Sequence, residues 1–422
     1  MELKKYKLAD IADFNKSSIS KSETFKEIIY LDTSSITENV VSGTVIMNTK
    51  EAPSRAQRKV TNNTIIYSTV RPRLKHYGIL SRPQNNFIVS TGFTTIDIKD
   101  LYKNKIDPRY LYLLLTQPTI TDYIGNIADT AVSAYPSINP SDLSSLCFMF
   151  PDYDIQKTIA DIWNNYDRKI ELNRAINQNL EAMAKQLYDY WFVQFDFPNE
   201  EGKPYKSSGG EMVWNDKLKR EIPKNWCVLQ LDKLCSFRNG INYTKDEIGE
   251  PFPIVNVRNI SSSTILLDGE DFDVITIPVK KAENYILTDK DIIIARSGCP
   301  GSTRLLQDSQ KTLFCGFIIC CTPYDGYKRY FLTYVLKGLE GSSATTSGGS
   351  ILQNVSQDTL KSLWVTVPRI DLLIRFNEII DNLLKQMCVS LRISKELIKQ
   401  RDELLPILMN GQVLVNSDLS AY

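Results

Sequence analysis

A segment of the sequence between Tyr135 and Trp191 returns between Gly349 and Leu408, shifted by 217 positions. Leu143, for example, recurs as Leu360, and the proline that follows the short apolar run recurs with it. A body of roughly 150 residues precedes each copy, so the pattern indicates a duplicated two-part unit and not an array of short repeats. Such a duplication suggests a protein that performs one task at two places.

Each copy contains a long stretch in which apolar residues step alternately by four and three positions. This spacing gives a narrow seam with a period of 3.5 residues, which is typical of a coiled-coil helix. Each stretch is joined at its N-terminal end to the body before it, so we expect two antiparallel helices that pack on one another. The alternative is two unrelated amphipathic helices, each packed on its own body. The predicted seam positions are Ile162, Ile176, Leu180, Leu187, Ile379, Ile393, Leu397 and Leu404.

The bodies are rich in short β-branched runs separated by Asn, Gly, Ser and Pro clusters, which predicts mostly β domains with a few helices. The two bodies match in outline, and each contains a Gly-Phe pair, Gly92-Phe93 and Gly316-Phe317. We therefore predict an α+β fold in a pseudo-two-fold arrangement. Its parts are a first body (1–150), a first spacer helix (151–194), a linker (195–221), a second body (222–367), a second spacer helix (368–411) and a C-terminal tail (412–422).

Charge and cysteine content limit the function only loosely. The net charge is +1, and residues 1–150 hold 18 basic and 14 acidic side chains, an excess that permits nucleic-acid binding without requiring it. The eight cysteines show no metal-ligand spacing and there is one histidine, so we expect reduced thiols and no metal site. Because we find no signal-peptide pattern and no long apolar run, we expect a cytoplasmic protein.

A search for catalytic motifs yields none that we accept. The sequence contains no phosphate-binding loop of the Gly-x4-Gly-Lys-Ser/Thr type and no Gly-x-Gly-x-x-Gly after a strand. The run Asn139-Pro140-Ser141-Asp142 is similar to a methyltransferase loop, but turn chemistry explains it better. His76 has no histidine counterpart in the second copy, where a duplicated enzyme would keep its base. We expect a protein that is not an enzyme.

Basic residues concentrate in one loop of each body. The first loop follows Tyr67 and the second follows Ala295, and both are rich in small or turn-forming residues. Arginine binds phosphate with two parallel hydrogen bonds and reads guanine edges, so these loops are candidates for DNA contact. A solvated basic loop is the alternative for each residue. The candidates, with a second cluster in the first body, are Arg55, Arg58, Lys59, Arg71, Arg73, Lys75, Arg296 and Arg304.

The region from Phe195 to Trp226, FDFPNEEGKPYKSSGGEMVWNDKLKREIPKNW, resembles the central region of specificity subunits of Type I restriction–modification enzymes. The run that starts at Pro151, PDYDIQKTIA, resembles the start of the spacer helix in the same family. The resemblance covers essentially the whole chain, although the recognition domains match only in outline. Where Gln156 would be repeated, the second copy departs from the pattern with Leu373.

The resemblance implies a non-catalytic subunit with two target-recognition domains, each reading one block of a bipartite double-stranded DNA target. The helices would fix the spacing of the two blocks, as half-site spacing does in dimeric DNA-binding proteins. Two modification (methyltransferase) subunits would dock on the helices and flip out adenine for methylation, and restriction subunits would complete the complex. S-adenosylmethionine, ATP and Mg are implied for these partners only, so we expect no cofactor in this chain. The competing hypotheses are a structural adaptor without a DNA role and a methyltransferase with an unrecognised donor site.

Overall fold

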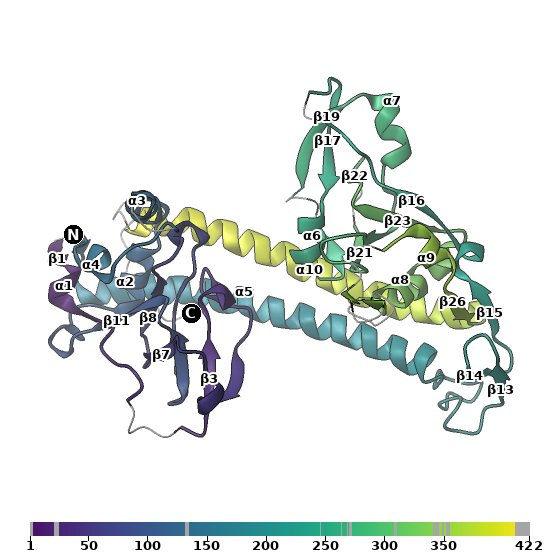
Figure 1. Ribbon diagram of the computed structural model, residues 1–422, viewed down its shortest axis with the longest axis horizontal. Coiled ribbons are helices and arrows are strands. Elements are labelled where there is room, and N and C mark those ends of the chain that lie inside the picture. The colour runs from purple at the N-terminus through teal and green to yellow at the C-terminus, as the bar shows by residue number, and fades with distance from the viewer. Residues whose placement is uncertain are drawn as a thin grey trace. The chain divides into compact units, whose positions relative to one another are not determined.

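The computed structural model describes residues 3–20, 25–130, 135–244, 246–262, 264–267, 269, 272–307, 310–340, 346–347, 350–351 and 355–409. The chain divides into two compact units, Met1–Lys169 with Leu397–Tyr422 (unit 1) and Ile170–Glu396 (unit 2). Each unit holds one domain and a part of each of two long helices, α5 (Tyr153–Tyr188) and α10 (Ile370–Met409), which are drawn in blue-teal and yellow in Figure 1. The expected tail (412–422) lies outside the described residues.

Unit 1 is built mainly from strands, namely β1 (Lys4–Lys7), β2 (Ala12–Phe14), β3 (Glu27–Leu31), β4 (Ile36–Thr37), β5 (Val40–Val41), β6 (Val45–Asn48), β7 (Ala56–Lys59), β8 (Ile65–Ser68), β9 (Tyr77–Ile79), β10 (Phe87–Ser90), β11 (Phe93–Ile98) and β12 (Cys147–Phe150). Two four-stranded sheets form its body, with the orders β6-β3-β10-β7 and β2-β11-β8-β9. Only β3 and β10 pair in parallel; their other neighbours and the whole second sheet are antiparallel. Strand β1 pairs with β12, and β4 with β5.

The helices of the unit 1 domain are α1 (Leu8–Ile11), α2 (Pro108–Leu115), α3 (Pro118–Asp129) and α4 (Pro140–Ser144). Helix α2 begins where the sequence favours a start, because the Asp107 side chain accepts the backbone N–H of Arg109 and Pro108 occupies the first turn. Its buried face, including Tyr110 and Leu111, packs into the core that the β2-β11-β8-β9 sheet provides. All four residues of β8 are buried, as expected for a central strand.

Unit 2 repeats this plan with the strands β13 (Met212–Asn215), β14 (Arg220–Pro223), β15 (Cys227–Gln230), β16 (Cys235–Asn239), β17 (Glu250–Val255), β18 (Leu266–Leu267), β19 (Asp273–Ile277), β20 (Ile292–Ala295), β21 (Thr303–Leu306), β22 (Leu313–Phe314), β23 (Ile318–Pro323), β24 (Thr346–Ser347), β25 (Ser350–Ile351) and β26 (Trp364–Val367). Its sheets have the orders β16-β23-β20-β21-β18 and β19-β17-β22, with the pairs β15-β26, β13-β14 and β24-β25. The helices are α6 (Val257–Ser262), α7 (Val279–Ala282), α8 (Arg329–Lys337) and α9 (Gln357–Lys361).

The sequence repeat is a structural repeat. Helix α9, strand β26 and the start of α10 each lie 217 positions after α4, β12 and the start of α5. The strand orders also correspond, since β16-β23-β20-β21 matches β2-β11-β8-β9 and the parallel pair β17-β22 matches β3-β10. Among the described strands of unit 2, none takes the place of β7 beside β22. The expected α+β class, with two mostly β domains and two long helices, is confirmed.

The expected linker contains a hairpin, β13-β14, and an aromatic cluster. Phe195 has a left-handed backbone (φ 67°), and its ring meets that of Trp226 edge-to-face at 5.3 Å. Phe197 stacks on the same indole at 5.3 Å. These aromatic contacts fasten the segment to the start of the unit 2 domain. Among the described residues, no helix has an apolar stretch long enough to cross a bilayer.

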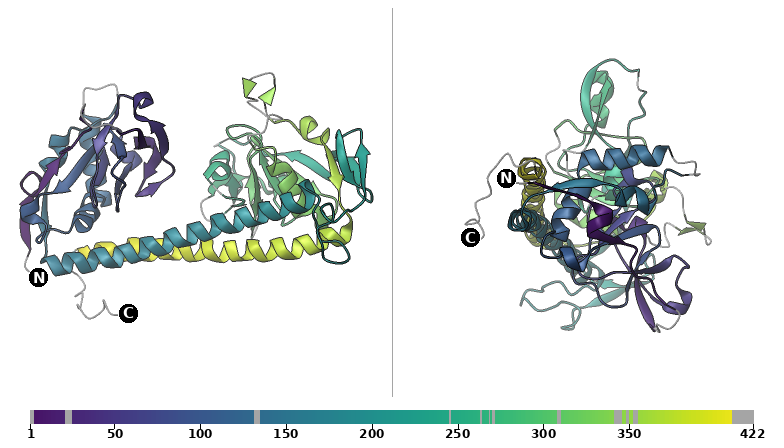
Figure 2. Two further views of the ribbon diagram at one scale, coloured as in Figure 1. Left: turned by 90° about the horizontal axis from the view of Figure 1, so that it is seen from below. Right: turned by 90° about the vertical axis from the view of Figure 1, so that its left-hand side faces the viewer.

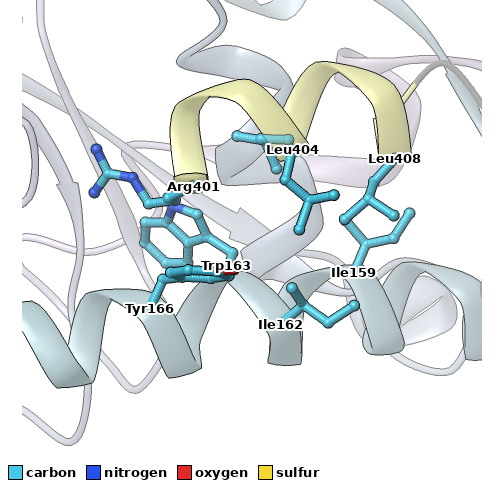
Figure 3. Close-up of a pocket in the computed structure, with 8 residues that line it drawn as sticks. Ile159, Ile162, Trp163, Tyr166, Arg401, Leu404 and Leu408 are labelled. Carbon is cyan, nitrogen blue, oxygen red and sulfur yellow. The ribbon is translucent and has the colours of Figure 1, made fainter. Parts of the chain in front are cut away.

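In unit 1 the two long helices pack in opposite directions (Figure 3). Ile159 and Trp163 of α5 lie against Leu408 and Leu404 of α10, around a small pocket that both helices line. Further along α5, Asp167 forms an ion pair of 2.8 Å with Arg401. As the α5 residue number rises the α10 number falls, so the expected antiparallel pairing holds in this unit.

The same pairing continues within unit 2, where the rings of Trp191, just after α5, and Phe376 lie 6.0 Å apart. The middle of the seam is polar: Asn177, Ser390 and Ser394 are all buried. The Ser390 hydroxyl donates to the backbone carbonyl of Asn173 at 3.3 Å. The Asn177 side-chain oxygen is buried without a hydrogen-bond partner among the described residues. This polar layer interrupts the apolar seam.

The predicted seam is wrong at three positions. Ile176, Ile379 and Ile393 are 48%, 41% and 48% exposed. Leu180 is buried, and Ile162, Leu187, Leu397 and Leu404 are partly buried. The buried face of α5 carries Ala160, Asn177 and Ala184. The large apolar residues Ile159, Trp163, Ile170 and Leu180 of α5 are buried as well. Beside Asn177 and Ala184, however, Ile176 and Met183 are exposed, so an apolar count alone misplaced this part of the seam.

Candidate nucleic-acid interface

A loop follows the central strand β8 of the unit 1 domain (loop 1, residues 69–76). The backbone N–H of Thr69 donates to the carbonyl of Gly92 at 2.9 Å. The carbonyl of Thr69 accepts the N–H of Ile138, also at 2.9 Å. The base of loop 1 is therefore held between two other segments of the domain, which fixes where its side chains emerge.

The loop after β20 of the unit 2 domain (loop 2, residues 296–302) is held by the same pattern of backbone hydrogen bonds, which we call the shared frame. The N–H of Arg296 donates to the carbonyl of Phe317 at 2.8 Å, and the Arg296 carbonyl accepts the N–H of Val355 at 2.9 Å. These bonds match those of loop 1 one for one. Arg296 thus takes the place of Thr69, and Phe317 takes the place of Gly92.

Both loops turn through two left-handed residues. In loop 2 these are Gly298 (φ 78°) and Gly301 (φ 83°), for which the conformation is easy. Loop 1 has Arg71 (φ 49°) and Lys75 (φ 57°) at the equivalent positions. A left-handed backbone costs a residue with a Cβ about 1–2 kcal/mol. Two long cations at strained backbone positions suggest a role for their side chains.

Arg71 is the best-presented of the predicted loop 1 residues. It is exposed, and its guanidinium lies over the ring of Tyr135, 5.0 Å from the centroid. Tyr135 is itself 58% exposed. A guanidinium stacked in this way keeps its N–H groups directed outward in its own plane, where phosphates or base edges can accept them.

The other two cations of loop 1 have acidic partners within the domain. Arg73 lies 3.2 Å from Asp122 and 3.2 Å from Asp129, both on α3. Lys75 lies 2.5 Å from Glu38. Their charges are already compensated, so they are weaker candidates for DNA contact than Arg71.

Two buried phenols lie under loop 1. Tyr67 on β8 and Tyr77 on β9 stack with their ring centroids 5.4 Å apart. Burial raises the pKa of Tyr67 to about 12. Burial, followed by the charge of Glu38, raises the pKa of Tyr77 above its ordinary value. Both phenols stay neutral at physiological pH and form a rigid platform for the loop.

The second predicted cluster lies on and before β7. Arg55 is exposed, and its carbonyl accepts the N–H of Thr91 at 2.8 Å. Arg58 lies 3.5 Å from the hydroxyl of Ser18, and its buried Nε has no hydrogen-bond partner among the described residues. Lys59 is partly buried. The structure thus gathers these cations at one strand of the unit 1 domain.

The proposed DNA contact of Arg304 is wrong. Arg304 is 7% exposed and lies within β21, and its Nη1 is 2.7 Å from the Glu340 carboxylate and 2.8 Å from the Thr303 carbonyl. The sequence-based loop extended two residues too far, into the strand. The Arg296 side chain, in contrast, is partly exposed at the start of loop 2.

His76 closes loop 1 and corresponds to Ser302. Its Nδ1 lies 2.6 Å from the Ile36 carbonyl and 3.2 Å from the Thr37 hydroxyl. Because the carbonyl can only accept, Nδ1 carries the proton, and the ring serves to hold the loop. Among the residues that the structure describes, no group of three or more His, Cys, Asp or Glu side chains is placed to hold a metal ion.

The sequence analysis missed two exposed aromatic residues beside the loops, Tyr135 and Phe317. Phe317 is 63% exposed, whereas Phe93 is 1% exposed on β11. The pairing of the two Gly-Phe dipeptides was out of register by one residue, because Phe93 pairs with Ser68 as Ile318 pairs with Ala295. The sequence signal that could have revealed the exposed ring is that Phe317 comes one residue before the apolar strand Ile318–Pro323 and does not belong to it.

Comparisons with known proteins connect this architecture with one family. Residues 1–182 match the family model of the Type I restriction modification DNA specificity domain. The chain is 24% identical to the specificity subunit of the Type I restriction enzyme HindI of Haemophilus influenzae, over 97% of this chain and 99% of that protein. It is also 24% identical to the MjaIX specificity subunit of Methanocaldococcus jannaschii, over 86% and 83% of the two chains. The chain is therefore similar to Type I restriction–modification specificity subunits over nearly its whole length.

A solved structure shows the same fold. The Type I restriction–modification S subunit of M. genitalium covers 97% of this chain, which covers 96% of that protein, with a TM-score of 0.53 and 16% sequence identity. Specificity subunits are non-catalytic members of their complexes. The similarity to named specificity subunits, and not the lack of a motif, therefore confirms the expectation that this chain is not an enzyme.

Proposed function

We propose that this specificity subunit reads a bipartite double-stranded DNA target, one block with each recognition domain, within a Type I restriction–modification complex. The observation that carries the proposal is the shared frame of loops 1 and 2. Equivalent backbone positions hold Thr69 and Gly92 in one domain and Arg296 and Phe317 in the other. Two copies of one scaffold with different loop side chains suit the reading of two different sequences, because loops on a rigid scaffold can vary without disturbing the core.

The loops supply chemistry that suits DNA. Arg71 and Arg296 stand at the two loops, and a guanidinium can donate in pairs to a guanine edge or to a phosphate. The cluster of Arg55, Arg58 and Lys59 adds phosphate-binding charge to the first domain. Arg73 and Lys75 support the loop through their acidic partners.

The helix pair offers a surface for protein partners. Five apolar side chains of α5 and α10 in unit 2 are about half exposed: Leu172 (54%), Ile176 (48%), Met183 (54%), Val389 (55%) and Ile393 (48%). Soluble proteins rarely expose large contiguous apolar patches, so such a patch usually indicates an interaction site.

The domain of unit 2 rests on one side of the two helices (Figure 2). Glu181 of α5 marks the domain side through its ion pair of 3.2 Å with Lys337, and Asn377 of α10 marks it by donating to the Tyr327 carbonyl at 2.9 Å. At about 100° per residue, the five apolar residues lie roughly 120–180° around the helices from these markers. They therefore form one stripe on the free side of the pair.

We assign this stripe to two docked modification subunits, with restriction subunits completing the complex. S-adenosylmethionine, ATP and Mg would act in those partners. The double variant Ile176→Glu with Met183→Glu should lose binding to the modification subunits, because two carboxylates cannot be buried unpaired at an interface. Leu101→Glu is the matched control, since Leu101 is 85% exposed and belongs to unit 1.

The function itself is tested in cells that express the chain with its modification subunits. Genome-wide methylation mapping should show one motif of two blocks separated by unread bases. Binding to the target duplex should weaken with salt, as expected when phosphate contacts release counterions. A complex that assembles normally but leaves DNA unbound at every salt concentration would instead identify a structural adaptor.

A further inference from the structure

Phe317 is an apolar side chain held in solvent by a rigid turn. Its ring is 63% exposed. The turn is closed by the N–H of Ile318, which donates to the Cys315 carbonyl at 2.9 Å, and the Ile318 carbonyl accepts the N–H of Gly240 at 3.0 Å. The Phe317 carbonyl accepts from Arg296. The ring thus projects from a backbone that is fixed on both sides.

Two glycines show how closely this turn is packed. A Cβ at Gly240 would lie 2.1 Å from the Cys315 carbonyl oxygen, and a Cβ at Gly316 would lie 2.1 Å from the Asn242 side-chain oxygen. The first clash is with backbone, which cannot move away as a flexible side chain can. The turn therefore has little freedom to fold the Phe317 ring back onto the domain.

The ring contributes little to the domain core, because buried residues on either side, Cys315 and Ile318, fill that role. The equivalent position in the first recognition domain holds Gly92, so the shared frame does not require a side chain there. The Phe317 ring is therefore a large apolar group that the fold neither requires nor covers. Its backbone carbonyl accepts the N–H of Arg296, so a cationic residue lies beside it. This combination suits contact with a ligand that has both apolar and anionic features.

We propose that Phe317 is a specificity-determining residue of the second recognition domain, which makes apolar contact with the C5 methyl group of a thymine while Arg296 binds the adjacent phosphate or base edge. The inference rests on the proposed DNA-recognition function. Thymine is the base that carries an apolar group in the major groove, and phenylalanine is among the side chains that contact it. A rigid backbone presents the ring without an ordering cost on binding.

The test uses the full complex of the specificity subunit with its modification subunits. Phe317→Ala and Phe317→Gly are compared with Tyr324→Ala, because Tyr324 is 67% exposed just beyond the other end of the same strand, β23. Methylation motifs are mapped in cells. Affinities are then measured for the target duplex and for duplexes in which single thymines of the second block are replaced by uracil, which lacks the methyl group.

Both Phe317 variants should lose discrimination at one thymine of the second block and bind the parent duplex about tenfold less tightly, the usual size of one lost base contact. The parent complex should lose a similar factor on the matching uracil duplex, and the Phe317 variants should not distinguish uracil from thymine there. Tyr324→Ala should behave as the parent does. The second block is identified as the one whose recognition Arg71→Gly leaves unchanged.

Three outcomes would overturn the assignment. The first is that both Phe317 variants keep the parental motif and affinity, and the second is that the second block contains no thymine. The third is weaker assembly of the complex with an unchanged motif, which would place the ring against a modification subunit. A parent complex that methylates no two-block motif would refute the proposed function instead, and that result is read from the parent alone.

Discussion

Arg71 and Gly298 occupy the same left-handed backbone position in two copies of one loop, with φ angles of 49° and 78°. Glycine adopts this conformation freely, whereas arginine does so at a cost. The first recognition domain therefore has a strained arginine where the second has an unstrained glycine. The difference allows the backbone role of the position to be separated from its side-chain role.

Arg71→Gly should leave the stability of the chain nearly unchanged and weaken DNA binding. Relief of the strained backbone contributes about 1–2 kcal/mol, and the freedom of glycine in the unfolded chain offsets roughly 0.5–1 kcal/mol of it. Loss of the guanidinium should cost about 1–3 kcal/mol if it contacts a base. Thermal unfolding and duplex titration measure the two effects.

Lys75→Gly is the matched control, because Lys75 is also left-handed but its ammonium pairs with Glu38. It should relieve the same strain with a smaller loss of affinity. Equal losses for the two variants would show that the loop backbone, and not the Arg71 side chain, determines binding.

Arg304→Ala should destabilise the second domain without changing the recognised sequence. The change removes one of the two cations that pair with the partly buried Glu340 carboxylate, which keeps Lys337 at 3.3 Å. The loss should therefore be about 1.5–3 kcal/mol, the size of a hydrogen bond to a charged group. Urea unfolding measures the loss. Arg296→Ala should show the reverse, with near-parental unfolding and weaker DNA binding; an Arg304 variant of parental stability would contradict the assignment of Arg304 to the core.

Leu180→Asp should unfold the helix pair far more readily than Ile176→Asp does. Leu180 is 8% exposed and Ile176 is 48% exposed, so only the first change buries an uncompensated charge, at a cost of several kcal/mol. Circular dichroism melts of both variants provide the comparison. Equal melting temperatures would mean that the seam runs where the apolar count had placed it.

Lengthening both helices should lengthen the unread spacer of the target and leave its two blocks unchanged. Four residues inserted after Arg174 and after Leu391 add about one helical turn, roughly 6 Å, so each helix keeps nearly the same facing. The added length is close to the rise of two base pairs. The methylation motif of cells that carry the altered subunit is the measurement. An active complex with an unchanged spacer would show that helix length does not set the spacing.

The sequence predicted the duplication well because a helix–strand–helix segment with the same offset keeps the same apolar positions, as α4, β12 and α5 do with α9, β26 and α10. It placed the seam less well because Ala160 and Ala184 pack closely against a neighbouring helix without standing out in an apolar count. Arg304 was misjudged because an arginine inside a buried strand, neutralised by Glu340 from a distant segment, has the same local sequence pattern as a loop cation.

The polar layer of Asn177, Ser390 and Ser394 fixes the axial register of the two helices. A coiled coil with a uniform apolar seam can slide by a heptad and pair again, which would shift one helix by about 10 Å, or roughly three base pairs of DNA. Here such a slide would set the buried polar side chains against apolar residues and break the bond from Ser390 to the Asn173 carbonyl. The layer lowers the packing energy of the helix pair. In return it fixes the register of the two helices, on which the spacing between the two halves of a DNA target would depend.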